Sequence, residues 1–555
     1  MLQNGVTGHI EYSWSDDIRE KIFQFQFQLT RTHDIKIILN LQRIAQDILI
    51  ILCLHEAIAL EYLILFYKII GHTRDIVDGK GEYMLTYMLI CVWYEFYPEL
   101  AFFALKCLVN MEGNHPYGSW KDIKYFCNYT VFVRMFPENH PLILYCIQLV
   151  NDQLKKDMEA LNKPISLVAK WIPREKSNKF GWLFHHLAND FFIYTKTSSP
   201  TNMHKAVLKS NTEYRKIISA LNSKLDTLEI KQCNKKWDKI NFQQVTSIGL
   251  IKQANAFLNI NANGENKDSS EERKECAGRF KMYIQQGETG EVDLKIGIGT
   301  LDIIKQAMEL IKIPVNEKTQ IKIDMLNIMW KKSTALMTPC YVIPLLDVSG
   351  YTCDLDAYYA GLGIALKMAE ISSFGKRIMV FGGSTKMISL DDCSNFMDMI
   401  KKVSIELDGK GLNANLYSSL DFLAASIIES KIPREDVQGL IVVILSNMEI
   451  DLLDINNKES LYTNICRKFK EGMPRFLLWN LKSTEGFPCH SLFPNVSMTS
   501  GYNPLFLNLF CQEGLKIKEY IPWNFFVKSL KNKRYDILER RITNFFKKNE
   551  IYCDL

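Results

Sequence analysis

Residues 338–350 read TPCYVIPLLDVSG, an apolar run that ends in Asp347-Val-Ser349-Gly. A short run of this kind is typical of a buried strand in a parallel sheet, and the polar residues behind it indicate a loop at the strand's carboxyl end. The run GLIVVILS at 439–446 has the same character and leads into Ser-Asn-Met-Glu. Two polar loops are therefore predicted at the carboxyl ends of two buried strands.

Helical patterns alternate with these strands. Residues 357–372 and 416–430 have helical spacing, and further apolar strands are predicted at 377–383 and 473–481. Strands and helices in alternation predict a doubly wound, Rossmann-like α/β domain, which we assign to residues 336–500. Because ligands of such sheets bind outside the carboxyl ends of the strands, the two polar loops form the expected binding face.

The chain before this domain has a helical pattern, with apolar residues at three- and four-residue spacing and turn-rich breaks. We predict a helical array or bundle and find no repeat of fixed period, which leaves a regular HEAT-like solenoid open. Four consecutive parts are expected: an N-terminal extension (1–35), a helical domain (36–335), the α/β domain (336–500) and a basic helical C-terminal segment (501–555).

Charge is unevenly distributed along the chain. The 555 residues carry a net charge of +5, but residues 161–260 alone contain 16 Lys and Arg against 6 Asp and Glu, an excess of +10. Clustered positive charge suits a phosphate-binding surface, because each neutralised phosphate releases counterions. A lysine-rich solvated surface explains the same composition, and the sequence does not decide between the two.

The cysteine pattern and the apolar segments indicate in which cellular compartment the protein is expected. Fourteen cysteines occur with no CxxC pair, which favours reduced thiols and a cytoplasmic protein. Residues 47–70 and 84–110 are apolar but carry charged residues in mid-run, and a charge at a bilayer centre costs about 2.5 kcal/mol or more. We therefore expect buried helices, with no signal peptide, no transmembrane segment and no membrane partner.

The sequence lacks the common catalytic motifs. It contains no GxxxxGK[ST], no HExxH and no GxSxG, so no phosphate-cradling loop, zinc-protease helix or nucleophile elbow is predicted. We expect a binding protein and not an enzyme, and we expect no catalytic residues and no cofactor.

The run Asp347-Val-Ser349-Gly-Tyr351 resembles the first motif of a von Willebrand A domain, Asp-x-Ser-x-Ser, in which carboxylate and hydroxyl oxygens hold Mg²⁺. The resemblance implies a Thr and an Asp on two further loops. Here Tyr351, Ala414 and Asn447 stand where the second Ser, the Thr and the Asp are expected. Only Asp347 and Ser349 match, so the resemblance implies the fold with a degraded metal site, and Mg²⁺ binding by Asp347 and Ser349 is the less favoured alternative.

Several motifs precede this run in order. They are RDIVDGKGEYMLTYMLICVWYEFY (74–97), YGSWKD (117–122), AKWIPRE (169–175), YRKIISALNSKL (214–225) and QVTSIGLIKQANAF (244–257). Together they resemble a family with a domain of unknown function found in plants, fungi, amoebae and giant viruses. The architecture is also similar to that of the Ro (TROVE) proteins, which implies RNA binding and a ribonucleoprotein role. The Ile-, Lys- and Asn-rich composition indicates an AT-rich genome, such as that of a giant virus or an amoebal host.

Cations interleave with aromatic residues in the basic region, a pattern that suits an RNA backbone with stacked bases. The RNA-binding residues predicted on this ground are Lys170, Trp171, Arg174, Lys176, Lys179, Tyr214, Arg215 and Lys216. A Trp near a Pro at a helix end is also common in cores, and an Arg-Glu neighbour pair is also a common surface ion pair. Trp120-Lys121-Asp122 is better explained as a helix start. The alternative function is a metal-independent protein-interaction scaffold that uses the loop face at Tyr351, Ala414 and Asn447.

Overall fold

The computed structural model describes residues 1–5, 8–54, 56–160, 163–194, 199, 202–261, 264–294, 299–349, 354–382, 384–407, 416–448, 459–511 and 520–553. The chain forms two compact units that interleave along the sequence. The first unit comprises Met1–His33, Arg43–Ile69 and Asn241–Asp536, and the second comprises Asp34–Gln42, Ile70–Ile240 and Ile537–Leu555. This division differs from the four consecutive parts expected from the sequence.

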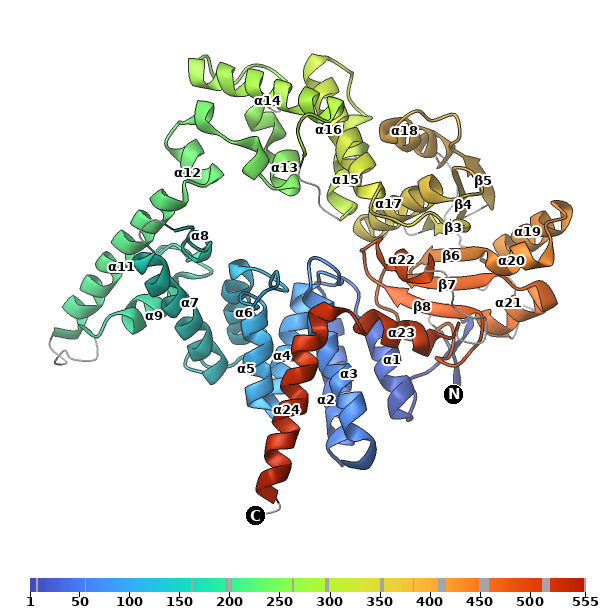
Figure 1. The fold of residues 1–555 in the computed structure, drawn as a ribbon, viewed down its shortest axis with the longest axis horizontal. Helices are drawn as coiled ribbons and strands as arrows, with labels where there is room; N and C mark the ends of the chain where they lie inside the picture. Colours follow the sequence, from blue (N-terminus) through green and yellow to red (C-terminus); the bar gives the residue numbers. More distant parts are fainter. Residues whose placement is uncertain are drawn as a thin grey trace. The chain divides into compact units, whose positions relative to one another are not determined.

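The first unit is built on a six-stranded sheet in the order β5-β4-β3-β6-β7-β8 (Figure 1). The strands are β3 (Val342–Asp347), β4 (Arg377–Phe381), β5 (Lys386–Ser389), β6 (Ile441–Ser446), β7 (Arg475–Asn480) and β8 (Val496–Ser500). All neighbours are parallel except β4 and β5. From β3 the chain adds β4 and β5 on one side, and then adds β6, β7 and β8 on the other side of β3. The topological switch point therefore lies between β3 and β6. The predicted doubly wound α/β domain is confirmed.

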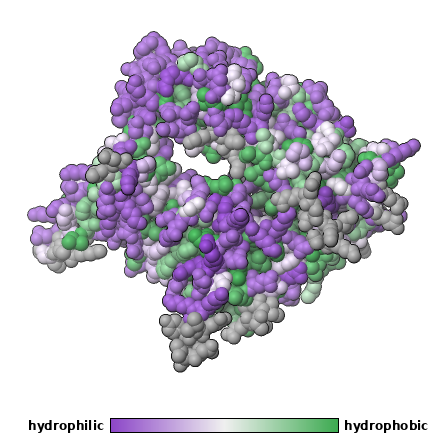
Figure 2. Space-filling model, viewed as in Figure 1, coloured by the Kyte–Doolittle hydropathy of each residue, from purple (hydrophilic) through white to green (hydrophobic). Residues whose placement is uncertain are grey.

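Helices of the first unit pack on this sheet and on one another. They are α13 (Ser247–Phe257), α14 (Glu271–Thr289), α15 (Leu301–Leu310), α16 (Glu317–Thr334), α17 (Leu355–Ile371), α18 (Phe396–Leu407), α19 (Leu416–Glu429), α20 (Arg434–Gly439), α21 (Leu461–Phe469), α22 (Phe506–Cys511) and α23 (Pro522–Leu530). Short 3-10 turns cover Phe242–Gln244, Lys470–Gly472 and Lys533–Tyr535. On the face shown in Figure 2, the surface over α14 is mainly hydrophilic, as its Glu- and Lys-rich sequence predicts.

Two glycines let α17 pack closely. A Cβ atom at Gly361 would lie 2.6 Å from Leu481 Cδ1, and one at Gly363 would lie 2.6 Å from Thr300 Cβ, just before α15. The absence of side chains at Gly361 and Gly363 therefore allows α17 to pack closely against the sheet on one side and against the start of α15 on the other.

The N-terminal residues complete the sheet's unit. They form a two-stranded hairpin, β1 (Leu2–Asn4) and β2 (Ile10–Tyr12), followed by α1 (Ile18–Gln28). The backbone N–H groups of Tyr12 and Phe487 each donate to the other's carbonyl oxygen at 2.9 Å. Glu20 accepts from the backbone N–H of Ser491 at 3.1 Å. The expected N-terminal extension is thus an integral part of this unit.

The second unit is helical, which confirms the predicted helical fold class for this part of the chain. Its helices are α4 (Tyr83–Phe96), α5 (Pro98–Cys107), α6 (Trp120–Phe132), α7 (Pro141–Glu159), α8 (Val168–Trp171), α9 (Gly181–Phe191), α11 (Met203–Leu225), α12 (Leu228–Cys233) and α24 (Asp536–Cys553), with a 3-10 turn at Trp237–Lys239. The long helices α2 (Ile35–Leu54) and α3 (Glu56–Arg74) contribute residues to both units.

Apolar helices are buried to different extents. All residues of α4 from 85 to 93 are buried, as predicted for this segment. Within the described ranges, α2 is the one helix whose length and composition would allow it to cross a membrane, and 33% of its most apolar 18-residue window is buried. No disulfide joins the cysteines whose side chains are described.

A buried ion pair fixes the start of α6. Asp122 Oδ1 accepts from Arg74 Nε at 2.7 Å, and Asp122 Oδ2 accepts from Arg74 Nη2 at 2.9 Å. Tyr87 donates its hydroxyl to the same carboxylate at 2.8 Å, and the N-cap residue Ser119 donates its backbone N–H at 2.8 Å. The Ser119 hydroxyl is a fifth donor, at 3.3 Å. Because five donors saturate the carboxylate, the start of α6 is held against α4 and the Arg74 end of α3.

Candidate functional site

Lysine and aromatic side chains gather in the second unit where α6, α8 and the segment before α9 meet. We call this cluster the basic aromatic platform; it comprises Lys121, Lys124, Tyr125, Lys170, Trp171, Lys179 and Phe180. The α6 members stand three and four residues apart and therefore share one helix face. The platform thus joins residues that are about fifty positions apart in sequence.

Lys124 lies at the centre of the platform. Its Nζ is 5.2 Å from the centroid of the Trp171 ring and 5.1 Å from that of Phe180. Lys121 Nζ lies 5.9 Å from the same Trp171 ring, and Lys179 Nζ lies 5.4 Å from Phe180. An ammonium group over an aromatic ring is attracted by about 0.5–1 kcal/mol at an exposed site. The rings therefore help to hold several positive charges close together.

The positive charge of the platform is largely uncompensated. Within the described ranges, no carboxylate forms an ion pair with Lys121, Lys124 or Lys179, whereas Lys170 pairs with Glu229 at 2.9 Å. Burial lowers the pKa of Lys124, and the neighbouring charge of Lys121 lowers that pKa further. Like charges held together in this way favour an anionic partner, because an anion relieves their mutual repulsion.

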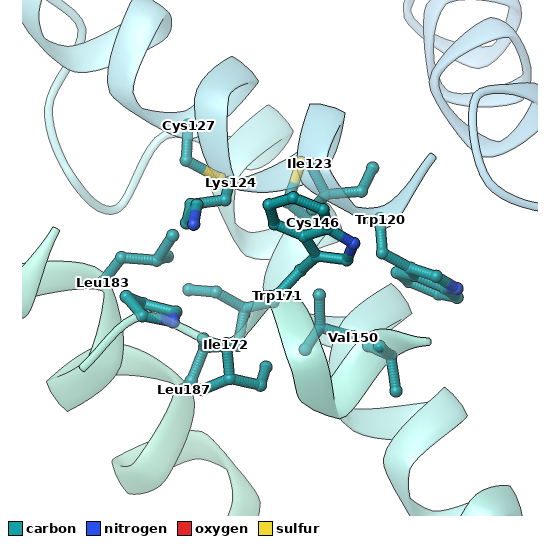
Figure 3. Close-up of a pocket in the computed structure, with 13 residues that line it drawn as sticks. Trp120, Ile123, Lys124, Cys127, Cys146, Val150, Trp171, Ile172, Leu183 and Leu187 are labelled. Carbon is teal, nitrogen blue, oxygen red and sulfur yellow. The ribbon is translucent and has the colours of Figure 1, made fainter. Parts of the chain in front are cut away.

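An apolar pocket lies beside Trp171 and Lys124 (Figure 3). It is lined mainly by Trp120, Ile123, Val150, Ile172, Leu183 and Leu187. Its accessible volume of about 10 Å³ is room for one water molecule. A nucleobase does not fit inside this pocket. A partner can therefore contact only the accessible outer surface of the half-buried Trp171.

The remaining predicted residues between α8 and α9 have mixed roles. Arg174 and Lys176 are exposed, but no described aromatic ring forms a cation–π contact with either of them. Glu175, which lies between them, pairs with Arg215 of α11 at 3.0 Å. Glu175 therefore forms an ion pair with Arg215 of α11 and not with its sequence neighbour Arg174, as the alternative had it.

Tyr214 is a core residue, and its predicted role in RNA contact is wrong. Its side chain is 0% exposed, and its hydroxyl donates to Asn151 Oδ1 at 3.1 Å. Lys216, two residues later on α11, is exposed and pairs with Glu213 at 3.0 Å. Of the residues predicted on α11, Arg215 and Lys216 therefore contribute only positive charge at the periphery of the platform.

Sequence reasoning missed the contribution of α6. Trp120 is the first residue of α6, with Ser119 as its N-cap, so the interpretation of this segment as a helix start is confirmed. The same helix nevertheless presents Lys121, Lys124 and Tyr125 to the platform. Their i, i+3, i+4 spacing was a signal in the sequence that could have found them.

The second candidate site lies at the switch point of the sheet. Asp347 ends β3, and its Oδ1 accepts from the backbone N–H of Ser349 at 2.9 Å and from the Ser349 hydroxyl at 2.5 Å. Its Oδ2 accepts from the hydroxyl of Ser446, the last residue of β6, at 2.7 Å. Ser446, which the sequence did not single out, in turn accepts from the backbone N–H of Met448 at 3.0 Å.

The described part of this site contains few ligands for a metal ion. Asn447 is half-buried immediately after β6, while Tyr351 and Ala414 lie outside the described residues. In the part of the chain that the structure describes, no three His, Cys, Asp or Glu side chains are grouped to hold a metal ion. Asp347 supplies one negative charge beside two hydroxyls, whereas hard divalent cations take six or more oxygen ligands, several of them carboxylates.

Two segments of the chain match known families. Residues 130–335 match the family described as domain of unknown function DUF2828. Residues 342–540 match the family described as domain of unknown function DUF7788. The first match runs from within α6 to the end of α16, and the second covers the whole sheet.

Two individual proteins are also similar. The uncharacterised protein L728 of Acanthamoeba polyphaga mimivirus is 25% identical over 439 residues, which is 75% of this chain and 71% of that protein. The crystal structure of the Deinococcus radiodurans RO (RSR) protein aligns with 88% of this chain and 96% of its own, at 10% identity and a TM-score of 0.36. The predicted resemblance to proteins of unknown function, a giant-virus protein among them, is thus supported.

Proposed function

We propose that this protein binds single-stranded RNA through the basic aromatic platform and acts as a binding protein, not an enzyme. The observation that carries the proposal is a set of three lysines, Lys121, Lys124 and Lys179, around the rings of Trp171 and Phe180. None of the three forms an ion pair with a carboxylate that the structure describes. Lysines neutralise the RNA backbone, and the accessible part of the half-buried Trp171 ring is available to stack on an unpaired base, a contact that contributes about 1–3 kcal/mol per base. The Phe180 ring is buried and holds the lysines in place.

The number of lysines sets the expected salt dependence. For single strands, the slope of log K against log salt is about −0.7 for each neutralised phosphate. Three or four platform lysines therefore predict a slope of about −2 to −3. A fully base-paired RNA offers no free base to the rings, so a single strand is the expected substrate.

The test is the binding of a labelled single-stranded RNA, followed by fluorescence anisotropy at several salt concentrations. Removing three charges with K121Q/K124Q/K179Q is expected to weaken binding by about tenfold or more and to make the salt slope shallower by about 2. The matched control, K205Q/K216Q/K236Q, removes three exposed lysines from the same basic region outside the platform and is expected to have a much smaller effect.

Two results would overturn the proposal. Unchanged affinity in the platform variant would show that RNA does not contact these lysines. An equal loss in the control variant would show that the whole lysine-rich region attracts RNA without a defined site. Trp171→Phe, which keeps a ring for stacking, is expected to bind more tightly than Trp171→Ala.

A further inference from the structure

Two cysteines that are far apart in the sequence meet in the first unit. Cys340 lies two residues before β3, and Cys511 is the last residue of α22. The Cys511 thiol donates a hydrogen bond to the sulfur of Cys340. Both residues are partly exposed, and no disulfide joins them in the structure. A reagent in solution therefore has access to two adjacent thiols.

An asparagine side chain explains why these thiols meet. Asn508 of α22 accepts from the backbone N–H of Thr338 at 2.9 Å, and its amide donates to the carbonyl oxygen of Leu336 at 3.0 Å. Cys511 stands three residues after Asn508 and shares its helix face. Cys340 stands two residues after Thr338 in the segment that enters β3, and alternate residues of an extended segment point to the same side.

The backbone on both sides of the pair is also fixed. The backbone N–H of Cys340 donates to the carbonyl oxygen of Ile371 at 3.3 Å, and its own carbonyl oxygen accepts from Ser373 at 3.0 Å. Beside Cys511, the ring centroid of Phe510 lies 3.8 Å from that of Phe525 in α23. The proximity of the two thiols is therefore set by the fold and does not depend on their side-chain rotamers alone.

An arginine lies at the same edge of the sheet. Arg475 is the first residue of β7, and both Arg475 and Val342 are in register with Ile441 of β6. Because these strands are parallel, Arg475 and Cys340 lie at the amino ends of their strands. This edge is opposite the carboxyl-end loops of Asp347 and Ser446, so the cysteine pair is separate from the candidate site at the switch point.

The hydrogen bond and the arginine distinguish the two thiols. The hydrogen bond from Cys511 lowers the pKa of the Cys340 thiol, burial opposes this change, and the charge of Arg475 lowers the pKa further. The Arg475 guanidinium donates to the carbonyl oxygen of Gly439 at 2.9 Å, while its Nε has no hydrogen-bond partner among the described residues. The hydrogen bond to Cys340 and burial raise the pKa of Cys511. Cys340 is thus the thiol that ionises first, and a thiolate is the reactive form of cysteine.

A second hydrogen-bonded pair, Cys127 and Cys146 of the second unit, is a natural comparison. Their side chains are 0% and 1% exposed. Burial raises the pKa of Cys146, and its hydrogen bond with Cys127 raises that pKa further. This pair is close but inaccessible and held in the thiol form, so we expect it to be inert.

We propose that Cys340 and Cys511 form a peroxide-sensitive dithiol that closes reversibly into a disulfide. The Cys340 thiolate attacks one oxygen of a hydroperoxide, the O–O bond breaks, and a sulfenic acid forms while the other oxygen leaves as hydroxide and takes up the proton that Cys340 released. The sulfur of Cys511 then attacks the sulfenic sulfur, and the sulfenic oxygen leaves as water with the Cys511 proton. Two thiols and one hydrogen peroxide give one disulfide and two waters, and a thiol reductant reverses the change by exchange.

The disulfide would close a loop that contains all six strands of the sheet. A long closed loop restricts the unfolded chain strongly, so oxidation is expected to raise the melting temperature of the first unit by roughly 5–10 °C. The inference goes beyond RNA binding and does not rest on it, because the pair lies in the first unit and the platform lies in the second.

The test starts from the reduced full chain, treated with an equimolar amount of hydrogen peroxide. Remaining thiols are then alkylated under denaturing conditions, and the peptides are mapped by mass spectrometry. The expected product is a linked peptide that joins Cys340 to Cys511, with Cys127 and Cys146 still alkylated as free thiols. C511S is expected to leave Cys340 as a sulfenic acid that dimedone traps, whereas C340S is expected to leave Cys511 reduced. Calorimetry is expected to show the rise in Tm in the unchanged protein and in neither variant.

Three results would overturn the inference: free Cys340 and Cys511 thiols after oxidation, a disulfide that joins either of them to another cysteine, or equal oxidation of Cys127 and Cys146. The last result would show that the oxidant acts on unfolded chains. The platform variant K121Q/K124Q/K179Q is expected to form the same linked peptide as the unchanged protein. The RNA proposal and the dithiol proposal therefore fail separately.

Discussion

Replacing Asp122 by alanine removes the acceptor that holds the start of α6. Arg74 would then lose both of its hydrogen bonds, at 2.7 and 2.9 Å, while its side chain remains about 10% exposed. Leaving one partner of a buried ion pair uncompensated costs about 3–5 kcal/mol. The hydroxyl of Tyr87 and the N–H of Ser119 also lose an acceptor, which makes the upper part of that range the expected cost.

The second unit has roughly 200 residues, for which 1 kcal/mol corresponds to about 2–4 °C in Tm. Asp122→Ala is therefore expected to lower the melting temperature of this unit by roughly 6–20 °C. Scanning calorimetry measures the shift, and hydrogen exchange in peptides from α6 shows where protection is lost. RNA affinity is expected to fall together with the melting temperature, because Lys121 and Lys124 lie beside Asp122 on the same helix.

The double variant R74M/D122L is the decisive control. Replacing both members of a buried pair by apolar residues is often close to neutral, so the double variant is expected to be more stable than Asp122→Ala. A double variant as unstable as the sum of the two single variants would show that Arg74 and Asp122 are not energetically coupled. That result would refute the role given to the ion pair.

Three further substitutions test packing and burial in the first unit. Burial lowers the pKa of Lys367, whose Nζ donates to Ser333 Oγ at 2.6 Å, from 10.5 to about 7. Between pH 7 and 10, Lys367 is therefore protonated in the unfolded chain but largely neutral in the folded one. The free energy of unfolding rises with pH across that window by at most about 1.4 kcal/mol per pH unit. Lys367→Met is expected to remove this contribution, as measured by thermal melts at several pH values. Gly363→Ala places a Cβ 2.6 Å from Thr300 Cβ and is expected to cost about 1–3 kcal/mol, also measured as a lower Tm. Gly278→Ala, in α14 with no atom within 4 Å of the new Cβ, is its counterpart and should gain up to about 1 kcal/mol; a loss there would contradict the steric explanation.

The fold of the α/β domain was predictable where the signal was local. β3 and β6 are continuous apolar runs, and their order along the chain already located the carboxyl ends at Asp347 and Ser446. β8 was not predicted, because its sequence VSMTS is short and polar although all five residues are buried. Its burial depends on helices packed over it, which is information that no local window contains.

The candidate site was predictable only in part for the same reason. The lysines near Trp171 were visible in one segment, but Lys124 joins them only when α6 packs against α8. Tyr214 lies on the inward face of α11, where Ala206, Ser210 and Tyr214 are buried at four-residue spacing, and the sequence alone did not show which face is buried. Aromatic residues beside cations are informative only after the buried face of their helix is known.

The pairing of Tyr12 with Phe487 has a consequence for the synthesis of the protein. The two residues are hydrogen-bonded in the same unit but are separated by most of the chain. At a translation rate of about 5–20 residues per second, the ribosome needs on the order of 20–100 s to deliver the second partner after the first. Throughout that interval, the β1–β2 hairpin and α1 lack the segment of Phe487 and Ser491 to which they are hydrogen-bonded in the folded unit. The contacts of the N-terminal hairpin and α1 with the segment around Phe487 therefore form only late in synthesis or after it.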